Sequence, residues 1–388
     1  MKKRKKKKKS FSLLDILSEV EDPRNDKGKR HPLPAMLALQ IIGFLCGLKG
    51  YTPIATWARS QKELTDKLGF TYEKTPCAAT FHNILKRINV KELEKALTKW
   101  IHKAVRSTPQ VAGCLDKVAI DGKIMRASKK SGASKPHLLS VVSHELGITI
   151  SQMGIINKTN ELPLSVEILD TFDVSGTVIT TDALLTQRTF CSAVIERDGD
   201  YVLPVKKNQR TLFEAIEKVF RDVPKTISDD TIHPILKEPI YAHETVEKSH
   251  GRLETRCINA STSLNAYLDW PGVAQVMRFR YTRKDLKTGE EIENVHYGIA
   301  SLSPKEASAE RLLAIKRGHW SIENKSHYLR DTQLGEDASP VRCGDIPQVM
   351  AALRNTALSV LRLAGVTRLT DKINYLASKP ILAANMIM

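Results

Sequence analysis

The alternation of strand-type and helix-type segments that begins at residue 113 limits this chain to a mixed α/β fold. Between residues 117 and about 220 the sequence predicts the order β-β-β-α-β-α-β-α, in the segments KVAID, HLLSVVSHE, GITISQMGI, ELPLSVEILDTF, TVITTD, TQRTFCSAVIERD, DYVLPVK and RTLFEAIEKVF. Leu146 and Gly147 separate the second and third strands, which indicates a hairpin. Three antiparallel strands followed by parallel strands with helical crossovers predict one mixed sheet with flanking helices.

The chain before and after this sheet carries other patterns. Apolar residues at helical spacing run through residues 11–112, which predicts an all-α N-terminal domain whose short helices are compatible with a helix-turn-helix. β-type and loop patterns return at about 225–300 and helical patterns follow, so we expect a β-rich insertion within one α/β domain at 113–362. Residues 1–10 predict a disordered basic tail, and residues 363–388 a C-terminal tail.

The charge of the chain indicates a polyanionic partner. The formal net charge is +17, and eight of the positive charges lie in residues 2–9, so +9 remains for the rest of the chain. A basic balance of this size is typical of nucleic-acid-binding proteins, and a solubilising charge excess is the alternative. The six cysteines form no CxxC pair, which excludes a zinc knuckle. The apolar run at 34–48 is short for a bilayer span and contains Gln40, so we expect a soluble, intracellular protein without a membrane partner.

Two acidic residues end two of the expected strands. Asp121 ends VAID and Asp182 ends VITTD. In neighbouring strands, about 4.8 Å apart, two such carboxylates repel each other unless a cation lies between them. Oxygen ligands favour Mg²⁺, and a pair of these ions drives in-line phosphodiester cleavage and transfer. An aspartate at a strand end is also a common helix cap or turn former, which is the structural alternative for either residue alone.

A third acid is expected from the segment RGHWSIENKSHYLRD, which has a helical pattern. Ile315, Ile322 and Leu329 are seven apart and form a stripe that can pack on the sheet. Glu323 lies beside that stripe, so it can face the ends of the strands. Basic groups on the same side of the helix suit DNA phosphates, and these are Lys316, His319 and Arg330.

The residues alone leave other assignments open. Four further acids compete for the second and third positions, namely Asp170, Asp173, Glu336 and Asp337. His319, Glu323 and His327 are four apart and share one face of a continuous helix, so a helix-borne zinc site is another alternative.

Long stretches of the chain resemble one family. The order of its motifs is that of bacterial insertion-sequence transposases of the DDE type, in the segments VAIDGKIMRAS, HLLSVVS, KTNELPLSVEILDTFDVSGTVITTDALLTQ, GDYVLPVKKNQ, HGRLETR and RGHWSIENKSHYLRDTQLGEDAS. The N-terminal segments DPRNDKGKRHPLPAMLALQIIGFLCGLKGY and TPCAATFHNILKRI resemble the branch that includes the H-repeat-associated proteins. The resemblance covers roughly residues 11–362. It implies an RNase H-like catalytic core with a β-rich insertion before the last catalytic helix.

The resemblance also implies a chemistry and its residues. The catalytic and metal-binding triad corresponds to Asp121, Asp182 and Glu323, with two Mg²⁺ ions for which Mn²⁺ can substitute. The implied enzyme cuts the ends of its insertion sequence, binds their inverted repeats and joins them to target DNA, as a homodimer on double-stranded DNA in the bacterial cytoplasm. DNA contacts are expected from Lys206, Lys207, Asn208, Gln209, His250, Arg252, Arg256, Lys316, His319 and Arg330.

This sequence departs from the superfamily pattern around Glu323. In the superfamily a Tyr, an Arg and a Lys accompany that glutamate, at seven and four residues before it and seven after it. Here the same places hold Lys316, His319 and Arg330, and Tyr328 stands where the branch usually has Trp. A degenerate copy that binds DNA without cutting it is therefore the alternative function, and a zinc enzyme is a third.

Overall fold

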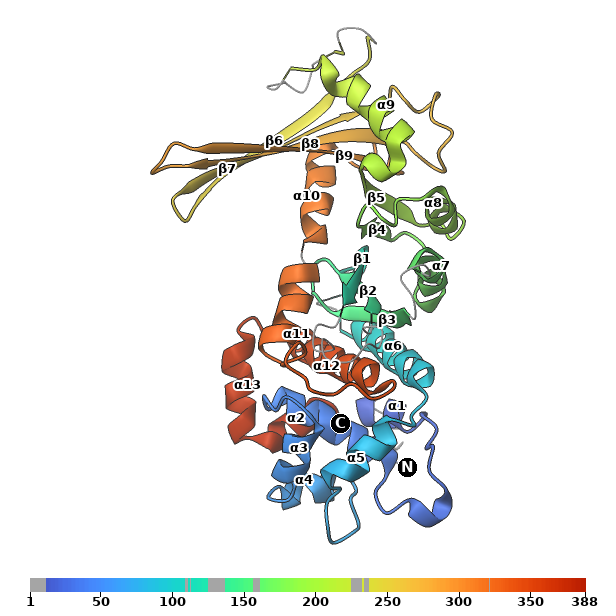
Figure 1. Cartoon of the computed structure of the whole chain (residues 1–388), viewed down its shortest axis with the longest axis vertical. Coiled ribbons are helices and arrows are strands. Elements are labelled where there is room, and N and C mark those ends of the chain that lie inside the picture. The colour runs from blue at the N-terminus through green and yellow to red at the C-terminus, as the bar shows by residue number, and fades with distance from the viewer. Residues whose placement is uncertain are drawn as a thin grey trace, which may run out of the picture.

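The computed structural model describes residues 12–108, 111, 113–124, 137–155, 161–224, 232–233, 237–320 and 322–388. Within these residues nine strands form one sheet in the order β3-β2-β1-β4-β5-β9-β8-β7-β6 (Figure 1). The mixed α/β fold expected from the sequence is confirmed. The strands are β1 Lys117–Ile124, β2 His137–Ser143, β3 Thr149–Ile155, β4 Val178–Thr181, β5 Asp200–Val205, β6 Tyr241–Ser249, β7 Arg252–Ser261, β8 Gln275–Asp285 and β9 Glu291–Ala300.

The first five strands follow the order predicted from the sequence. β1 pairs antiparallel with β2, and β2 with β3, whereas β4 runs parallel to β1 and β5 parallel to β4. Helix α7 (Glu161–Glu167) lies between β3 and β4, helix α8 (Arg188–Ile195) between β4 and β5, and helix α9 (Arg210–Arg221) follows β5. Alternate residues of β1, Val118 and Ile120, pack with α8 and α9 in one apolar core. The opposite face of β1 is therefore available to other helices.

The β-rich segment expected as an insertion extends this same sheet. β9 pairs antiparallel with β5, and β8, β7 and β6 follow outward in turn. Strands of 9, 10, 11 and 10 residues rise about 3.3 Å per residue, so they reach well beyond the shorter strands. They project sideways from the molecule, and β6–β9 are termed the arm (Figure 1).

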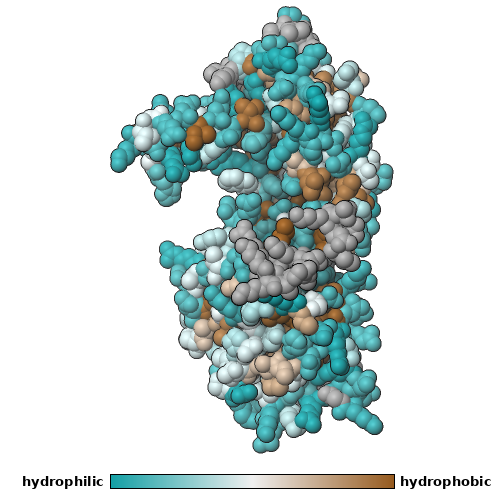
Figure 2. Space-filling model, viewed as in Figure 1, coloured by the Kyte–Doolittle hydropathy of each residue, from teal (hydrophilic) through white to brown (hydrophobic). Residues whose placement is uncertain are grey.

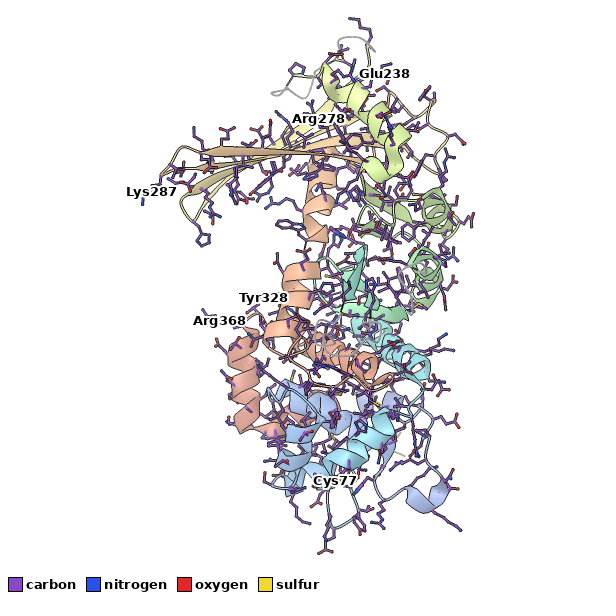
Figure 3. All side chains as sticks on the ribbon, in the orientation of Figure 1. Cys77, Glu238, Arg278, Lys287, Tyr328 and Arg368 are labelled. Carbon is purple, nitrogen blue, oxygen red and sulfur yellow. The ribbon has the colours of Figure 1, made fainter. Side chains whose placement is uncertain are left out.

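A buried arginine holds the base of the arm to α9. Arg278 of β8 donates from Nε to Asn259 Oδ1 at 3.0 Å and from Nη1 to the carbonyls of Phe220 and Val223 at 2.6 and 3.2 Å. A buried guanidinium needs such acceptors, since an unpaired buried charge is strongly unfavourable. Figure 3 shows Arg278 beside α9 and Lys287 at the far tip, so this contact holds the base of the arm.

The helices at the two ends of the chain pack together into one further body, termed the helical unit. Helices α2 and α12 are buried along almost their whole length in its core, and no described helix is long and apolar enough to cross a membrane. The unit contains α1 Leu13–Leu17, α2 Leu33–Leu45, α3 Tyr51–Ala58, α4 Lys62–Lys67, α5 Ala78–Leu85, α6 Val90–Arg106, α12 Ile346–Leu363, α13 Leu369–Ser378 and α14 Pro380–Asn385.

The prediction that residues 363–388 form a tail is wrong. Leu376 of α13 is fully buried, and Ile387, just past α14, joins the same core as α1 and α2. The amide of Leu13 donates to the carbonyl of Ile387 at 2.9 Å, which ties the two ends of the described chain together. The helical unit is therefore built from both ends of the chain. The predicted basic tail at 1–10 lies outside the described residues.

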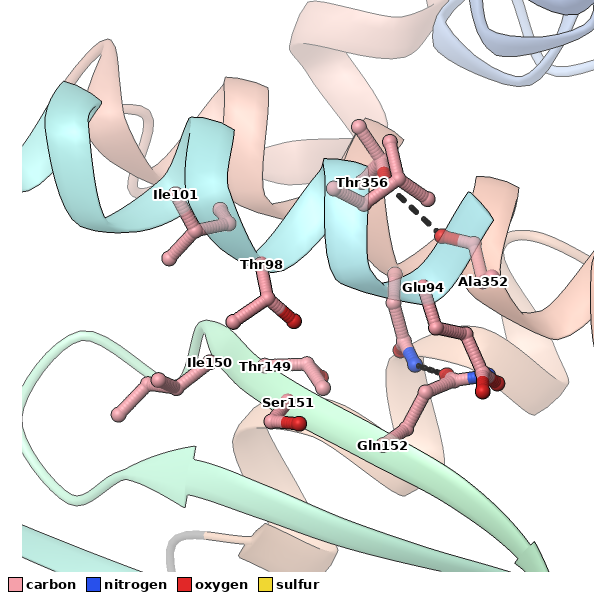
Figure 4. A pocket seen from close by; sticks show the side chains of 11 residues that line it. Glu94, Thr98, Ile101, Thr149, Ile150, Ser151, Gln152, Ala352 and Thr356 are labelled. Carbon is pink, nitrogen blue, oxygen red and sulfur yellow. Dashed lines mark hydrogen bonds between the residues drawn. The ribbon is translucent and has the colours of Figure 1, made fainter. Parts of the chain in front are cut away.

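A buried carboxyl group joins the helical unit to the sheet edge. Glu94 of α6 accepts hydrogen bonds from Gln152 of β3 at 2.7 Å and from Gln348 of α12 at 2.9 Å. Figure 4 shows Glu94 and Gln152 beside a small cavity, whose lining also includes Thr98 and Thr356. Burial raises the pKa of Glu94 to about 7, and the two amide donors only partly oppose that shift.

Glu94→Gln is expected to make folding stability less sensitive to pH. Because the folded-state pKa of Glu94 lies above the ordinary 4.5, its contribution to stability is complete below pH 4.5 and is lost as the pH rises through 7. Between pH 4.5 and 8 the free energy of unfolding of the wild type should therefore fall by about 3 kcal/mol relative to that of the variant. Urea unfolding at both pH values measures this difference. Parallel pH profiles for the two proteins would contradict it.

Candidate active site

Asp121 and Asp182 lie on adjacent parallel strands. The pairing of β1 with β4 ends at Ile120 and Thr181, so each aspartate follows the last paired residue of its strand. Asp121 still pairs with Ser140 of β2, whereas Asp182 comes directly after the end of β4. Strands in a sheet are about 4.8 Å apart, and the two aspartates therefore start from neighbouring backbone positions.

The turn after β4 shapes the position of Asp182. Its Oδ1 accepts hydrogen bonds from the amides of Leu184 and Leu185 at 3.0 and 3.3 Å, so this residue also forms the turn that the structural alternative required. Asn208 donates to the carbonyl of Ala183 at 2.7 Å and supports the same turn from the segment after β5. Although it supports the turn, the side chain of Asp182 remains exposed to solvent.

The segment with Glu323 is not the continuous helix that was predicted. Helix α10 (Ala309–His319) ends four residues before it, Ile322–His327 (η7) form a π-helix, and α11 runs over Tyr328–Thr332. A π-helix is a rare, wider turn that is frequent at functional sites. Ile322 packs against Ala119 and Val142 on the face of the sheet opposite α8 and α9. This contact keeps the exposed Glu323 close to the strand that carries Asp121.

The charges of the three acids act on one another. Burial raises the pKa of Asp121 to about 6, and the charges of Asp182 and Glu323 add to the rise, while a hydrogen bond from the amide of Gly122 opposes it. In the described part of the chain, no three His, Cys, Asp or Glu side chains converge as ready ligands of one metal ion. The acids are therefore near enough to repel one another and are not gathered around a single point.

A fourth acid, Glu161, was not singled out from the sequence. Its charge also raises the pKa of Asp121. A Cβ atom on Gly122 would come within 2.9 Å of Glu161 Oε1 and 2.5 Å of His137 Nε2, so both side chains lie close to the backbone next to Asp121. The signal in the sequence was KTNELPL, in which Glu161 opens the helix after the third strand.

The two histidines near Glu323 contact different groups. His319 Nδ1 lies 3.0 Å from Thr180 Oγ1, which also contacts His144 Nε2 at 2.9 Å, so α10 is fastened to β4. A side chain on Gly318 would collide with the ring of His144, which explains the glycine at this close approach. His327 Nδ1 instead lies 3.9 Å from Asp121 Oδ2. The two rings do not face a common ligand, which counts against the zinc alternative.

Both histidines are neutral at pH 7. Burial and the charge of Lys316 lower the pKa of His319 to about 4, with Asp182 opposing the change. Burial and the charges of Arg330 and Lys123 lower the pKa of His327 to about 3. At the superfamily's arginine position, His319 can therefore offer a hydrogen bond but no positive charge.

The remaining residues expected at DNA near the active site differ in exposure. Lys206 and Lys207 are exposed beside the turn after β4, whereas Gln209 donates to the carbonyl of Thr186 at 3.1 Å and supports that turn. The ammonium of Lys316 lies over the ring of Phe279, 4.9 Å from its centroid. Arg330 is fully buried, and we therefore remove it from the set of predicted DNA contacts.

The residues expected at DNA on the arm are not grouped with Asp121. His250 occupies the exposed turn between β6 and β7 with φ of +49°, and Arg252 follows it. Arg256 pairs with Glu247 at 3.0 Å and lies 5.2 Å from the ring centroid of Tyr281. Glu247 also pairs with Arg317 of α10 at 2.8 Å, so this face of the arm is turned toward α10. A recess lined mainly by hydrophilic residues lies below the arm (Figure 2).

Three of the four competing acids have other partners. Asp170 pairs with Arg197 at 2.7 Å and Asp173 with Arg106 at 3.6 Å, both on the surface away from Asp121. Glu336 is buried against Arg330 at 2.6 Å. These contacts favour Asp182 and Glu323 for the second and third positions.

Comparisons with known families identify the family of the chain. The family model described as "Transposase DDE domain" matches residues 112–360, which is most of the chain. The chain belongs to the DDE transposase family. A second family model, described as "DDE_Tnp_1-associated", matches residues 4–101 of this DDE transposase.

Several relatives of this DDE transposase carry transposase names. It is 28% identical over 361 residues to the protein named transposase YncI of Escherichia coli O157:H7, covering 90% of this chain and 87% of that one. It is 27% identical over 386 residues to the H repeat-associated transposase YhhI of E. coli K12, covering 94% and 97%. A piggyBac transposase synaptic complex with hairpin DNA matches with a TM-score of 0.42 and 9% identity, covering 96% and 78%, which is too distant to support an argument.

Proposed function

We propose that this DDE transposase cuts the ends of an insertion sequence and joins them to target DNA, with Asp121, Asp182 and Glu323 as its catalytic residues. The observation that carries the proposal is the position of Asp121 and Asp182 directly after the last paired residues of the parallel strands β1 and β4, with Ile322 packed on β1 next to Glu323. The charges of Asp182 and Glu323 also raise the pKa of Asp121, which agrees with that position. The strand order β3-β2-β1-β4-β5, with two antiparallel and two parallel pairings, supports an RNase H-like core.

The donor set fits a hard divalent cation. The three side chains offer only carboxylate oxygens, and mutual repulsion favours a cation between them. Asp121, Asp182 and Glu323 would hold two Mg²⁺ ions, or Mn²⁺ in their place. Bound there, the ions would stabilise charge on the scissile phosphate and activate the attacking oxygen.

The other residues of the site would bind and orient DNA. Exposed Lys206 and Lys207 lie beside the Asp182 turn and would contact phosphates, while neutral His319 would contribute a hydrogen bond. His250 and Arg252 would extend the contact along the arm, which borders the hydrophilic recess. The helical unit would bind the terminal inverted repeats, with two copies of the chain holding two ends in the bacterial cytoplasm.

An assay with the ends of the element tests this function. A supercoiled plasmid that carries those ends should be cut by the wild type with Mg²⁺ or Mn²⁺, and the released ends should join to a target plasmid. No product should form in EDTA. DNA affinity should fall steeply with salt, because phosphate contacts release counterions. Salt-dependent binding without cleavage under any of these conditions would instead support the DNA-binding alternative.

A further inference from the structure

A buried group of charges lies directly behind the proposed catalytic acids, and we term it the charge cluster. Glu336 is at its centre and is 1% exposed. Arg330 of α11 donates from Nε and Nη2 to the two oxygens of Glu336 at 3.0 and 2.6 Å. Lys123 of β1 lies 3.0 Å from the same carboxylate and also pairs with Asp331. One carboxylate therefore joins the Asp121 strand to the segment that follows Glu323.

The charge cluster extends into the helical unit through Arg354. This fully buried residue of α12 donates to the carbonyls of Leu334 and Lys49 at 3.1 and 3.3 Å, and its guanidinium lies 4.9 Å from the ring centroid of Phe44. Its members are three cations, Lys123, Arg330 and Arg354, and two carboxylates, Asp331 and Glu336. The charge of Asp337, next to Glu336 in the sequence, also acts on Asp331, so cations and carboxylates are balanced in a region with little water to screen them.

The cations of the cluster are close to Asp121. Lys123 is two residues after Asp121, so both side chains leave the same face of β1 from positions about 7 Å apart, which a lysine can bridge. His327 lies between, with Nδ1 at 3.9 Å from Asp121 Oδ2 and with Arg330 and Lys123 lowering its pKa.

Glu336 is ionised over the whole working range of pH. Burial alone would oppose its ionisation, yet the charges of Arg330 and Lys123 outweigh burial and lower its pKa to about 2. If this charge were removed, the three cations would outnumber the remaining carboxylates, Asp331 and Asp337. A buried cation without a partner is strongly unfavourable, so it would turn to the nearest remaining carboxylates.

We propose that Glu336 is a positioning residue of the active site, which holds Lys123 and Arg330 away from Asp121 and so leaves that carboxylate available to a divalent cation. The role rests on the proposed function, because it concerns the metal site of that reaction. It also fixes β1, which carries Asp121, against α11, which directly follows the π-helix that carries Glu323. Arg330, which stands at the superfamily's lysine position, thereby forms a buried ion pair inside the protein.

The first test needs no metal. A crystal structure of Glu336→Gln, grown without divalent ions, should show Lys123 Nζ or the Arg330 guanidinium within about 4 Å of the Asp121 carboxylate, the range of an ion pair. Lys123 and Arg330 in their original places would overturn the proposal. This result does not depend on whether the protein cuts DNA.

The second test compares variants by the charge of the cluster. Glu336→Gln raises its net charge by one, and Lys123→Met in that background reverses the change. Mn²⁺ affinity, measured by electron paramagnetic resonance, should fall about tenfold or more in the single variant and recover in the double variant. Lys123→Met alone should bind Mn²⁺ at least as tightly as the wild type. A purely structural role predicts instead that the double variant recovers nothing.

The controls separate folding and function from positioning. If Glu336→Gln does not fold, Glu336→Asp replaces it in both tests, because a side chain one methylene shorter moves the carboxylate away from one cation. The loss of Mn²⁺ affinity should then be smaller, and Lys123→Met should again reverse it. A wild type that neither binds Mn²⁺ nor cuts DNA would refute the proposed function, and the metal-free structure would still decide the role of Glu336. A wild type that does both, with a Glu336→Gln variant that binds Mn²⁺ equally well, would overturn the positioning role alone.

Discussion

Asp182→Asn is expected to reduce DNA strand cleavage on the order of 10³-fold, the scale on which single members of a catalytic group act. Asparagine keeps an Oδ1 acceptor for the amides of Leu184 and Leu185, so the turn after β4 should remain intact. What the substitution removes is one negative charge beside Asp121. Cleavage of end-bearing DNA in single-turnover assays, together with DNA binding by the same protein, measures the two effects separately.

The competing acids provide matched controls for this result. Asp170→Asn and Asp173→Asn make the same chemical change, but those side chains pair with Arg197 and Arg106 on the surface. Exposed ion pairs contribute at most about 1 kcal/mol, so both variants should fold and cut like the wild type. Wild-type-like cleavage by Asp182→Asn, or an equal loss in Asp170→Asn, would refute the assignment of the second catalytic acid.

The positions of the aspartates follow from local sequence patterns. A buried β-type run that ends at an acid predicts that the acid lies at the end of a strand, and Asp182 does directly follow β4. The same prediction is wrong for Asp121, because β1 continues to Ile124 through its pairing with β2. The parallel pairing of β1 with β4 follows from the helical crossovers between them. Local patterns therefore sufficed for the order of β1 to β5, on which two of the three proposed catalytic acids lie, but not for the pairing of β9 with β5 that adds the arm to the same sheet.

The surroundings of Glu323 could not be predicted in the same way. Apolar residues at positions 315, 322 and 329 fit a continuous helix, and the π-helix at Ile322–His327 depends on contacts of Ile322 with β1 and β2. The basic character of Arg330 suggested DNA, whereas its burial depends on Glu336, six residues further along in an irregular segment. Tertiary contacts thus determine both the π-helix and the burial of Arg330, and neither can be predicted from the spacing of apolar residues.

The C-terminal segment shows the same limit at longer range. Its helices are short, and α13 has only three buried residues, Leu369, Ile373 and Leu376. Short helices are weakly stable alone, so the local pattern gave no reason to expect more than a tail. Their partners are α1 and α2, more than 300 residues earlier, and the Sγ of Cys46 donates to the carbonyl of Leu376 across that separation.

Ending the chain after Val366 is therefore expected to unfold the helical unit. The truncation removes α13 and α14 and exposes apolar surface of α1 and α2, including the region of Leu13 that is tied to Ile387. Each large aliphatic side chain taken out of the core forfeits about 2 kcal/mol, and native domains have only about 5–15 kcal/mol in total. Circular dichroism and limited proteolysis should show loss of helix and early cleavage before residue 108, while inverted-repeat binding is lost.

A pair of point variants in α13 tests the contribution of this helix to stability without a truncation. Leu376 is fully buried and its neighbour Tyr375 is 45% exposed on the same helix. Leu376→Ala should lower the free energy of unfolding by about 3 kcal/mol, since it loses buried surface and leaves a cavity. Tyr375→Ala, which removes more atoms from the outer face, should cost less than about 1 kcal/mol because that ring is largely in water. Equal urea midpoints for the two variants would mean that α13 does not pack as described, and the truncated chain would then remain folded.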